Sequence, residues 1–318
     1  MKKIWVKIVL ILGIATGGAY GWYWQSLHHV AIVSQPSEKV SQTANVSATE
    51  SDKQEKLAMT SNDWINSLIL GTDNGENEVS RSDTMMLVSA NVDTHQVAVI
   101  SIPRDTRVSL QGVGQTKINH ANAVGVSEGG VRQGTLESAK AVSDLLGVTI
   151  NYYSKINFQG FQKVIDAVGG IDINLPYPVN DSKAHFSAGE HHLSGDEALR
   201  LARSRYGVPN GDFDRQKDQF FLLSALAHQM LSPSNISKLP EALNIIHQDL
   251  VDTNLSTSEM LTLGLAFKGI TKDEIRYYQL PGKGITAHDP LVGTDVYYYE
   301  PDMDGVKRVV EEALKLKS

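Results

Sequence analysis

Short apolar runs alternate with amphipathic patterns along most of the chain. Each run is rich in leucine or β-branched residues and most end at glycine, asparagine or proline, which favour turns, so the runs predict buried β-strands. The predicted strands are Ser67 to Leu70, Thr84 to Ala90, Gln96 to Ile102, Val148 to Tyr153 and Ile171 to Leu175.

Apolar residues recur at helical spacing in the segments between and after these strands. One such stripe follows a possible cap at Thr135 and ends at Gly147, and a second runs from Phe158 to Val168. Capping-box spacings mark two further helix starts, at Ser194 with Glu197 and at Ser256 with Glu259. Strands that alternate with amphipathic helices predict an α/β fold, in which a sheet is covered by helices.

The first 24 residues have a different pattern. Lys2, Lys3 and Lys7 precede an almost uninterrupted apolar run from Ile8 to Trp24. A helix over this run and its flank would be about 30 Å long, which matches the bilayer core. The lysines favour a cytoplasmic start, so we predict a cytoplasmic head over residues 1–7 and a transmembrane helix over residues 8–24. A cleaved signal peptide is the alternative, because Gly17-Gly18-Ala19 resembles a small-residue cleavage site.

The segment after this run is polar. Residues 34–56 are mostly serine, threonine, glutamine, glutamate and lysine, a composition that cannot bury enough apolar surface to fold. We therefore predict a flexible extracellular stalk over residues 25–59. Because no internal repeat or second linker follows, the remainder predicts one extracellular domain over residues 60–318.

Composition narrows the function classes. The chain of 318 residues has a formal net charge of −7, which argues against a general nucleic-acid surface. It contains no cysteine, which excludes disulfides and cysteine-based zinc sites. The histidines lack metal-ligand spacing, so they are interpreted as surface or core residues.

Charged residues collect where the predicted strands begin and end. Asp73 follows the first strand, Arg81 and Asp83 precede the second, and Arg104-Asp105 follows the third. If these strands are neighbours, the charges converge at one edge of the sheet, and two aspartates there could hold Mg²⁺ together with water. Taken singly, each residue is better interpreted as a surface charge in a turn.

A second charged cluster lies where a predicted helix ends. Arg200, Arg203 and Arg205 fall just before a run of helix breakers, and Arg215 and Gln219 then share one face of the next helix. Arginine recognises phosphate in a planar, bidentate manner, so the cluster could bind a pyrophosphate. A salt-bridged helix surface is the alternative. Likewise, Tyr297-Tyr298-Tyr299 could stack on carbohydrate or could be a strand packed on the core.

These residues fall in motifs that resemble the LytR-CpsA-Psr family of cell-envelope proteins. The motifs follow one another in family order between about Ile69 and Met230, and they are Leu70-Gly71-Thr72-Asp73, Arg81-Ser82-Asp83-Thr84, Ser101-Ile102-Pro103-Arg104-Asp105, Lys117-Ile118-Asn119-His120-Ala121, Val168-Gly169-Gly170-Ile171, Gly195 to Leu199 with Arg203 and Arg205, and Asp212 to Gln219.

The resemblance implies a Mg²⁺-assisted phosphotransferase with an apolar tunnel for a lipid tail. Its fold would be a three-layer α/β/α sandwich with a central mixed sheet, preceded by the transmembrane helix and stalk. It would move a teichoic acid, capsular polysaccharide or similar glycopolymer from a polyprenyl pyrophosphate carrier to peptidoglycan, outside the membrane of what is expected to be a Gram-positive cell.

The resemblance also assigns roles to residues. Asp73 and Asp83 match metal-binding aspartates, and the residues that match those around the pyrophosphate are Arg81, Arg104, Lys117, Arg203, Arg205, Arg215 and Gln219. We expect Arg81, Arg104 and Arg205 to act in catalysis, with Asp105 or a metal-bound carboxylate as the base. Asp218 departs from the family, where a basic residue is frequent, which puts the local charge and donor preference in doubt.

Two other functions use the same features. A hydrolase would cleave the lipid pyrophosphate with water, because it needs the same cations and metal. A non-enzymatic regulator or transcription attenuator is the third hypothesis, but a cytoplasmic head of a few residues cannot form a DNA-reading module.

Overall fold

The structure is a computed structural model that describes residues 64–73, 80–204, 211–232, 235–271 and 274–314. The predicted cytoplasmic head, transmembrane helix and stalk lie outside these residues. Within the described ranges, no helix is both long and apolar enough to cross a membrane.

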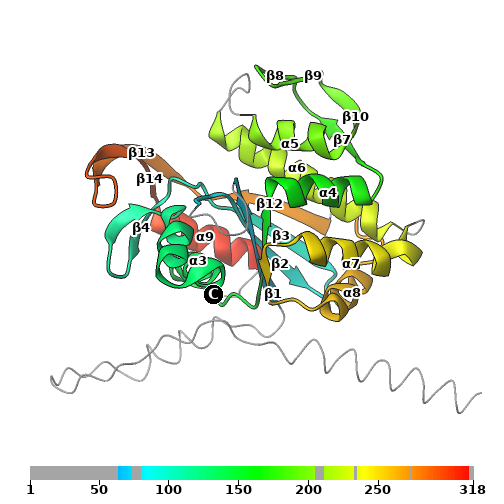
Figure 1. Cartoon of the computed structure of the whole chain (residues 1–318), viewed down its shortest axis with the longest axis horizontal. Helices are drawn as coiled ribbons and strands as arrows, with labels where there is room; N and C mark the ends of the chain where they lie inside the picture. Colours follow the sequence, from blue (N-terminus) through cyan, green and yellow to red (C-terminus); the bar gives the residue numbers. More distant parts are fainter. Residues whose placement is uncertain (1–63, 74–79, 205–210, 233–234, 272–273, 315–318) are drawn as a thin grey trace, which may run out of the picture.

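A central six-stranded sheet organises the molecule (Figure 1). Its strands lie in the order β11-β6-β1-β2-β3-β12. Their bounds are β1 Trp64–Thr72, β2 Ser82–Asn91, β3 Gln96–Ser101, β6 Tyr152–Asn157, β11 Asp252–Thr253 and β12 Ile275–Gln279. Because β1 pairs antiparallel to β2 and parallel to β6, the sheet is mixed, as the family resemblance implied.

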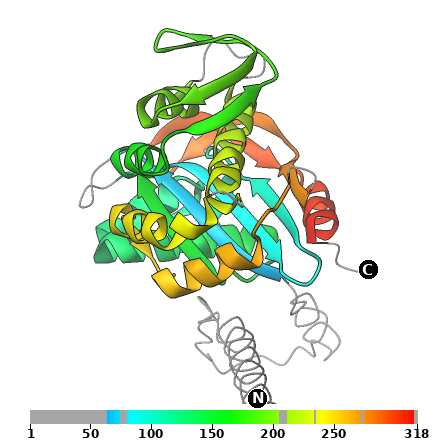
Figure 2. The ribbon, with the colours of Figure 1, turned by 90° about the vertical axis from the view of Figure 1, so that its right-hand side faces the viewer.

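Helices lie on both faces of this sheet (Figures 1 and 2). One face carries α3 (His120–Leu146) and α9 (Met303–Leu314), which pack with the strands into a continuous apolar core. The other face carries the helices that Figure 2 shows in front of the sheet, which are α4 Phe158–Ala167, α6 Asp212–Leu231, α7 Leu239–Asp249 and α8 Thr257–Ala266, with the short 3₁₀ helix η1 Ile236–Lys238 before α7.

Four two-stranded units extend from this body. One group, β4 (Arg107–Leu110) with β5 (Gly114–Lys117) and β13 (Gly282–Asp289) with β14 (Thr294–Pro301), lies at the left in Figure 1. The other group lies at the top with helix α5, and it comprises β7 Ile171–Leu175 paired with β10 Gly189–Leu193, β8 Val179–Asp181 paired with β9 Ala184–Phe186, and α5 Gly195–Arg203.

Most of the predicted elements are confirmed, and two are displaced. The predicted strand Val148 to Tyr153 is wrong at its start, because β6 begins at Tyr152 and continues through the polar pair Ser154-Lys155. Lys155 can lie in a central strand because its Nζ donates a hydrogen bond of 2.7 Å to the buried Asn122 Oδ1.

Helix α3 begins at His120, well before the predicted cap at Thr135. Its first half contains glycines, which weaken the helical pattern in the sequence. The helix breaks at Gly129 and Gly130, where the backbone dihedral angles are not helical. The break folds the two halves together, since a Cβ on Gly125 would lie 2.6 Å from the Gln133 carbonyl oxygen. The glycines that weaken the helical pattern are therefore the residues that allow this close packing.

Candidate active site

A cavity of about 900 Å³ lies between the sheet and the helices α4, α6, α7 and α8. Most of it is apolar, and the side chains along its length include Ile69, Val88, Phe161, Leu223, Leu226, Met230, Ile246 and Met260. One end is polar and contains Asp73, Asp83, Arg203, Arg215 and Gln219. The structure thus brings five of the predicted site residues to the mouth of an apolar channel.

Strand β1 and helix α6 show how the sequence builds this cavity. Side chains of a strand alternate between its faces, so Leu68 and Leu70 enter the core while Ile69 lines the cavity. Along α6, residues three or four positions apart share a face, which places Arg215 and Gln219 at the polar end and the leucines beyond them. One helix face therefore changes from charged to apolar along the cavity.

A β-bulge aims Asp83 into the cavity. Gly71 pairs with Thr84 and Thr72 pairs with Ser82, which leaves Asp83 as an extra residue in β2. Asp73 follows β1 directly, so both predicted metal ligands line the cavity from adjacent strands. The bulge also interrupts the alternation by which residues two apart, such as Arg81 and Asp83, would share a face of the strand. Arg81 is exposed and is not among the described residues that line the cavity.

Arg104 links the cavity to a group of carboxylates beside it. Its Nη1 donates a hydrogen bond of 2.7 Å to Asp83 Oδ1, and its Nε lies 3.7 Å from Asp105 Oδ2 and 3.9 Å from Asp212 Oδ1. Burial would lower the pKa of Arg104, but these carboxylates raise the pKa above its ordinary value. The Nε is buried and has no hydrogen-bond acceptor among the described residues, so a donor remains at the centre of the cluster.

The loop that carries Arg104 and Asp105 is fixed by the segment that carries Lys117. Lys117 Nζ donates a hydrogen bond of 2.7 Å to Asp105 Oδ1. The backbone N–H of Ile118 donates to the Thr106 carbonyl and that of Asn119 donates to the Arg104 carbonyl, at 2.8 and 3.2 Å. Two motifs that are separate in the sequence therefore form one rigid unit at the site.

Arg215 is only 2% exposed and is held by three hydrogen bonds to two residues. Its Nε and Nη2 donate to Asp212 Oδ1 at 2.9 and 2.7 Å, and its Nη1 donates to the Asp83 carbonyl at 3.2 Å. Burial would raise the pKa of Asp212, but Arg215 and Arg104 lower it, so this carboxylate stays ionised. Asp212 is not among the site residues predicted from the sequence, although its spacing of three residues from Arg215 in a helix is a signal for the pair.

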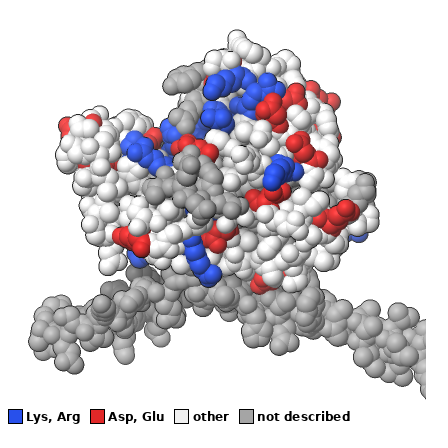
Figure 3. Space-filling view, viewed as in Figure 1, with Lys and Arg blue, Asp and Glu red and all other residues white. Residues whose placement is uncertain are grey.

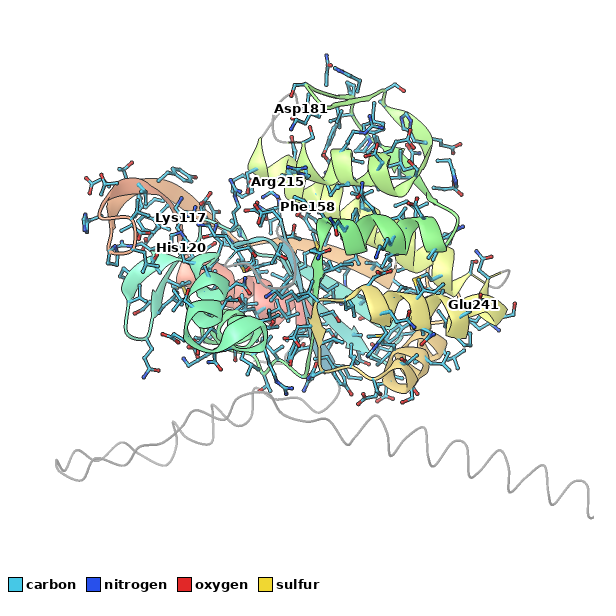
Figure 4. The ribbon with its side chains drawn as sticks, viewed as in Figure 1. Lys117, His120, Phe158, Asp181, Arg215 and Glu241 are labelled. Atoms are coloured by element: carbon cyan, nitrogen blue, oxygen red, sulfur yellow. The ribbon has the colours of Figure 1, made fainter. Side chains whose placement is uncertain are left out.

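Only part of the second charged cluster lies within the described residues. The guanidinium of Arg203 lies 4.5 Å from the centre of the Phe158 ring, a cation–π contact at the cavity wall. Gln219 Nε2 donates a hydrogen bond of 3.0 Å to the Ala202 carbonyl, which joins α6 to the end of α5. The assignment of Arg205 lies outside the described residues. Figure 3 shows acidic and basic side chains side by side near the middle of the face in view. Figure 4, drawn from the same side, labels Lys117, Phe158 and Arg215 around this region.

Asp218 points away from the cavity and into the protein. It is fully buried, and its Oδ1 accepts a hydrogen bond of 2.9 Å from the Tyr177 hydroxyl. Burial raises the pKa of this carboxyl to about 7, despite the hydrogen bond from Tyr177. The departure from the family pattern at this position is therefore an internal carboxyl, and it leaves Arg215 and Gln219 in place.

The histidine and tyrosine alternatives have different outcomes. His120 is buried and its Nδ1 lies 2.7 Å from Thr116 Oγ1, which confirms a core residue. Among the described residues, no group of three or more histidines or acids could hold a metal ion. Tyr298 and Tyr299 are buried in β14, as the core-strand interpretation predicts, but Tyr297 is 52% exposed and departs from it.

Comparison with known proteins gives the same picture. The sequence matches the LytR_cpsA_psr family over residues 31–315. It is 33% identical over 306 residues to the polyisoprenyl-teichoic acid–peptidoglycan teichoic acid transferase TagU of Bacillus cereus, covering 95% of this chain and 93% of that protein. The crystal structure of B. subtilis TagV superposes with a TM-score of 0.67 and 31% identity over 80% of this chain and 99% of that one. The crystal structure of B. subtilis TagU has a TM-score of 0.59 and 28% identity over 80% and 97% of the two chains.

Proposed function

The chain belongs to the LytR-CpsA-Psr family, and from that premise we propose that it is a phosphotransferase that moves a glycopolymer from a polyprenyl pyrophosphate carrier to peptidoglycan. A relative that aligns with 95% of the chain is named a teichoic acid transferase, which supports a transferase of this kind. Teichoic acid or a related glycopolymer, including capsular polysaccharide, is the proposed cargo.

One observation carries the proposal: a single cavity joins an apolar channel to a polar mouth, where Arg203 and Arg215 lie with Asp73 and Asp83. A polyprenyl pyrophosphate has the same division, since a long apolar chain ends in a charged diphosphate. The volume of about 900 Å³ is within the range of sites that bury a large ligand. Burial of the lipid would supply the binding free energy, and the cations would place the diphosphate.

The cations have distinct places around the diphosphate. Arg203 and Arg215 line the cavity itself, and Arg104 reaches it through Asp83. Lys117 is set behind Asp105, so it orients that carboxylate and adds positive charge from a second side. We call this group of cations around the diphosphate the clamp. We propose that Arg81 and Arg205 also belong to it, because of their positions in the family motifs.

The two aspartates fit a magnesium ion. Mg²⁺ is usually held by one or two carboxylates together with water and substrate phosphates. Asp73 and Asp83 supply two carboxylates from adjacent strands at the mouth, and the described residues contain no further acid or histidine that completes a protein cage. We therefore propose that they hold Mg²⁺, which would neutralise charge on the diphosphate.

The proposed reaction is an in-line displacement at the phosphorus that bears the saccharide. A hydroxyl oxygen of the acceptor sugar forms a bond to this phosphorus, and the bond from phosphorus to the bridging oxygen breaks. Polyprenyl monophosphate leaves, and the hydroxyl proton passes to Asp105. Arg104 and Arg215 are rigidly held before the reaction, so they can stabilise the charge that develops on the leaving phosphate.

The proposal places the catalytic domain outside the cell membrane, anchored in single-pass type II orientation by the N-terminal helix predicted from the sequence. Peptidoglycan and a membrane-embedded lipid carrier are both accessible from that side. A protein confined to the cytoplasm could not reach peptidoglycan.

Product analysis tests the reaction. The full-length protein is incubated with Mg²⁺ and a lipid-linked saccharide, with and without soluble peptidoglycan fragments. Transfer predicts a covalent conjugate that requires the fragments and that is lost when a chelator removes the metal. Free phosphosugar as the sole product would show a hydrolase instead, and an intact donor under every condition would leave the regulatory hypothesis.

A further inference from the structure

Tyr297 differs from the two tyrosines that follow it. Tyr298 and Tyr299 are 0% and 6% exposed, whereas Tyr297 is 52% exposed although it lies in the same strand. Single exposed aromatic residues are common on protein surfaces and need no explanation on that ground alone. The position of the Tyr297 ring relative to the candidate active site is the reason to consider a function for it.

The ring is held in place by the opposite strand. Tyr297 pairs with Thr286, and its ring leans onto Gly284, where an added Cβ would lie 2.8 Å from the ring carbon Cε2. Gly284 therefore provides a flat backbone surface against one side of the ring. The other side faces solvent, so the hairpin presents a fixed aromatic surface at little cost in side-chain entropy.

The β13–β14 hairpin is attached directly to the loop that carries Arg104 and Asp105. The backbone N–H of Tyr299 donates a hydrogen bond of 2.8 Å to the Asp105 carbonyl, and Tyr299 forms a parallel bridge with Thr106. The Tyr299 ring also packs edge-on against Phe213, with centroids 5.4 Å apart, and Phe213 follows Asp212. Both carboxylate-bearing segments are thereby tied to β14.

These contacts place Tyr297, two residues before Tyr299 in β14, next to the loop that carries Asp105. Partial burial, followed by the negative charges of Asp105 and Asp212, raises the pKa of its hydroxyl. Tyr297 is absent from the described lining of the cavity, whereas Asp83 belongs to it and joins the cluster through Arg104. The charge cluster is therefore connected to the cavity through Asp83 and to the hairpin through Asp105.

We propose that the exposed face of Tyr297, together with Asp105 and Asp212, forms the subsite that binds the saccharide of the peptidoglycan acceptor. This inference rests on the proposed function and deepens it. A sugar presents an apolar C–H face that packs on an aromatic ring, while its hydroxyls donate hydrogen bonds to carboxylates. An acceptor bound here would direct a hydroxyl toward Asp105, the proposed base, from outside the cavity that would hold the lipid.

Direct binding tests the subsite without requiring catalysis. Soluble peptidoglycan fragments are titrated against the full-length protein in the absence of donor, and binding is followed by saturation-transfer NMR. Tyr297→Ala is expected to raise the dissociation constant roughly three- to tenfold. Tyr297→Phe keeps the ring and should bind close to the wild type, and Leu291→Ala, an exposed residue at the turn of the same hairpin, should have no effect.

The acceptor and donor constants in the transfer assay give a second readout. Tyr297→Ala should raise KM for the peptidoglycan fragment and leave KM for the lipid-linked donor unchanged. Fragment binding that is equal in Tyr297→Ala and wild type, or absent in the wild type, would overturn the subsite. Fragment binding that depends on Tyr297 in a protein without transferase activity would support the subsite and reject the proposed function.

Discussion

The two faces of the central sheet are built from the same strands but have opposite organisation. On the α3 and α9 side, Leu68, Leu70 and Leu87 are fully buried in a continuous core. On the α4 and α6 side, Ile69 and Val88 come from the same two strands and line a cavity. Apolar side chains of the same two strands thus form a packed core on one face of the sheet and line a cavity on the other.

The difference shows how an α/β domain can separate stability from function. The packed face loses contacts when any methyl group is removed, because its interior is close-packed. The cavity face already lacks those contacts, so its residues can be selected for shape and charge. The following predictions test how complete this separation is.

The largest expected effect is at the polar mouth. Arg104→Ala should lower the rate of transfer by about 10²-fold or more, because it removes a preorganised cation from the developing phosphate charge. The fold should remain intact, since the Arg104 side chain is partly exposed and lies outside the described apolar core. Transfer rates and thermal unfolding of the same samples check both statements, and Arg308→Ala on the exposed surface of α9 is the matched control.

Full transfer activity in Arg104→Ala would remove this residue from the clamp. A large loss of stability would instead show that the polar mouth is part of the folding core, which would break the comparison between the two faces.

The next effect compares neighbours in one strand. Leu68→Ala should lower the free energy of unfolding by about 3 kcal/mol, because it opens a void in the packed face. Ile69→Ala should lower it by about 1 kcal/mol or less, because its side chain already borders a cavity. Urea denaturation of the two variants measures this difference, and equal losses would contradict it.

A pH-dependent effect is expected inside α6. The pKa of Asp218 is raised to about 7 in the folded protein, above its value in an unfolded chain, so the folded state binds the proton more tightly. Stability should therefore fall as pH rises from about 4 to about 7 and level off above that. Asp218→Asn mimics the protonated form and should stabilise the protein by on the order of 2 kcal/mol near pH 8 and by less near pH 5.

Urea unfolding of wild type and Asp218→Asn at both pH values measures this change. A stabilisation that is the same at both would show that the buried carboxyl does not titrate in this window.

The smallest effect concerns the volume of the cavity. Leu226→Trp should weaken binding of the lipid-linked donor by about tenfold, since it fills space that the polyprenyl chain would occupy. KM for the peptidoglycan fragment should not change. Tighter donor binding, or an effect on the acceptor alone, would place the lipid elsewhere.

Much of this arrangement could be read from the sequence. The apolar runs located β1, β2, β3 and β7, and the charges after Leu70 and Ile102 indicated the edge at which the site forms. The spacing of Arg215 and Gln219 placed both on one helix face, and both line the cavity. Local patterns of this kind depend only on the period of a strand or helix.

The remaining features depend on tertiary contacts. The cavity was expected only from the family resemblance, because an apolar residue such as Leu226 has the same pattern whether it meets a core or a void. The spacing of Asp212 from Arg215 indicates only a pair on one helix, and it is the fold that brings Arg104 beside this carboxylate. The exposure of Tyr297 likewise follows from the pairing of its strand with a glycine-containing partner.

The most direct test of the account is the structure of the full-length protein with a polyprenyl pyrophosphate-linked saccharide bound. The account predicts continuous lipid density along Leu223, Leu226 and Met230, with the diphosphate between Arg203 and Arg215 and next to Asp73 and Asp83. Lipid density on another surface, with the cavity empty and the arginines free of phosphate, would contradict it.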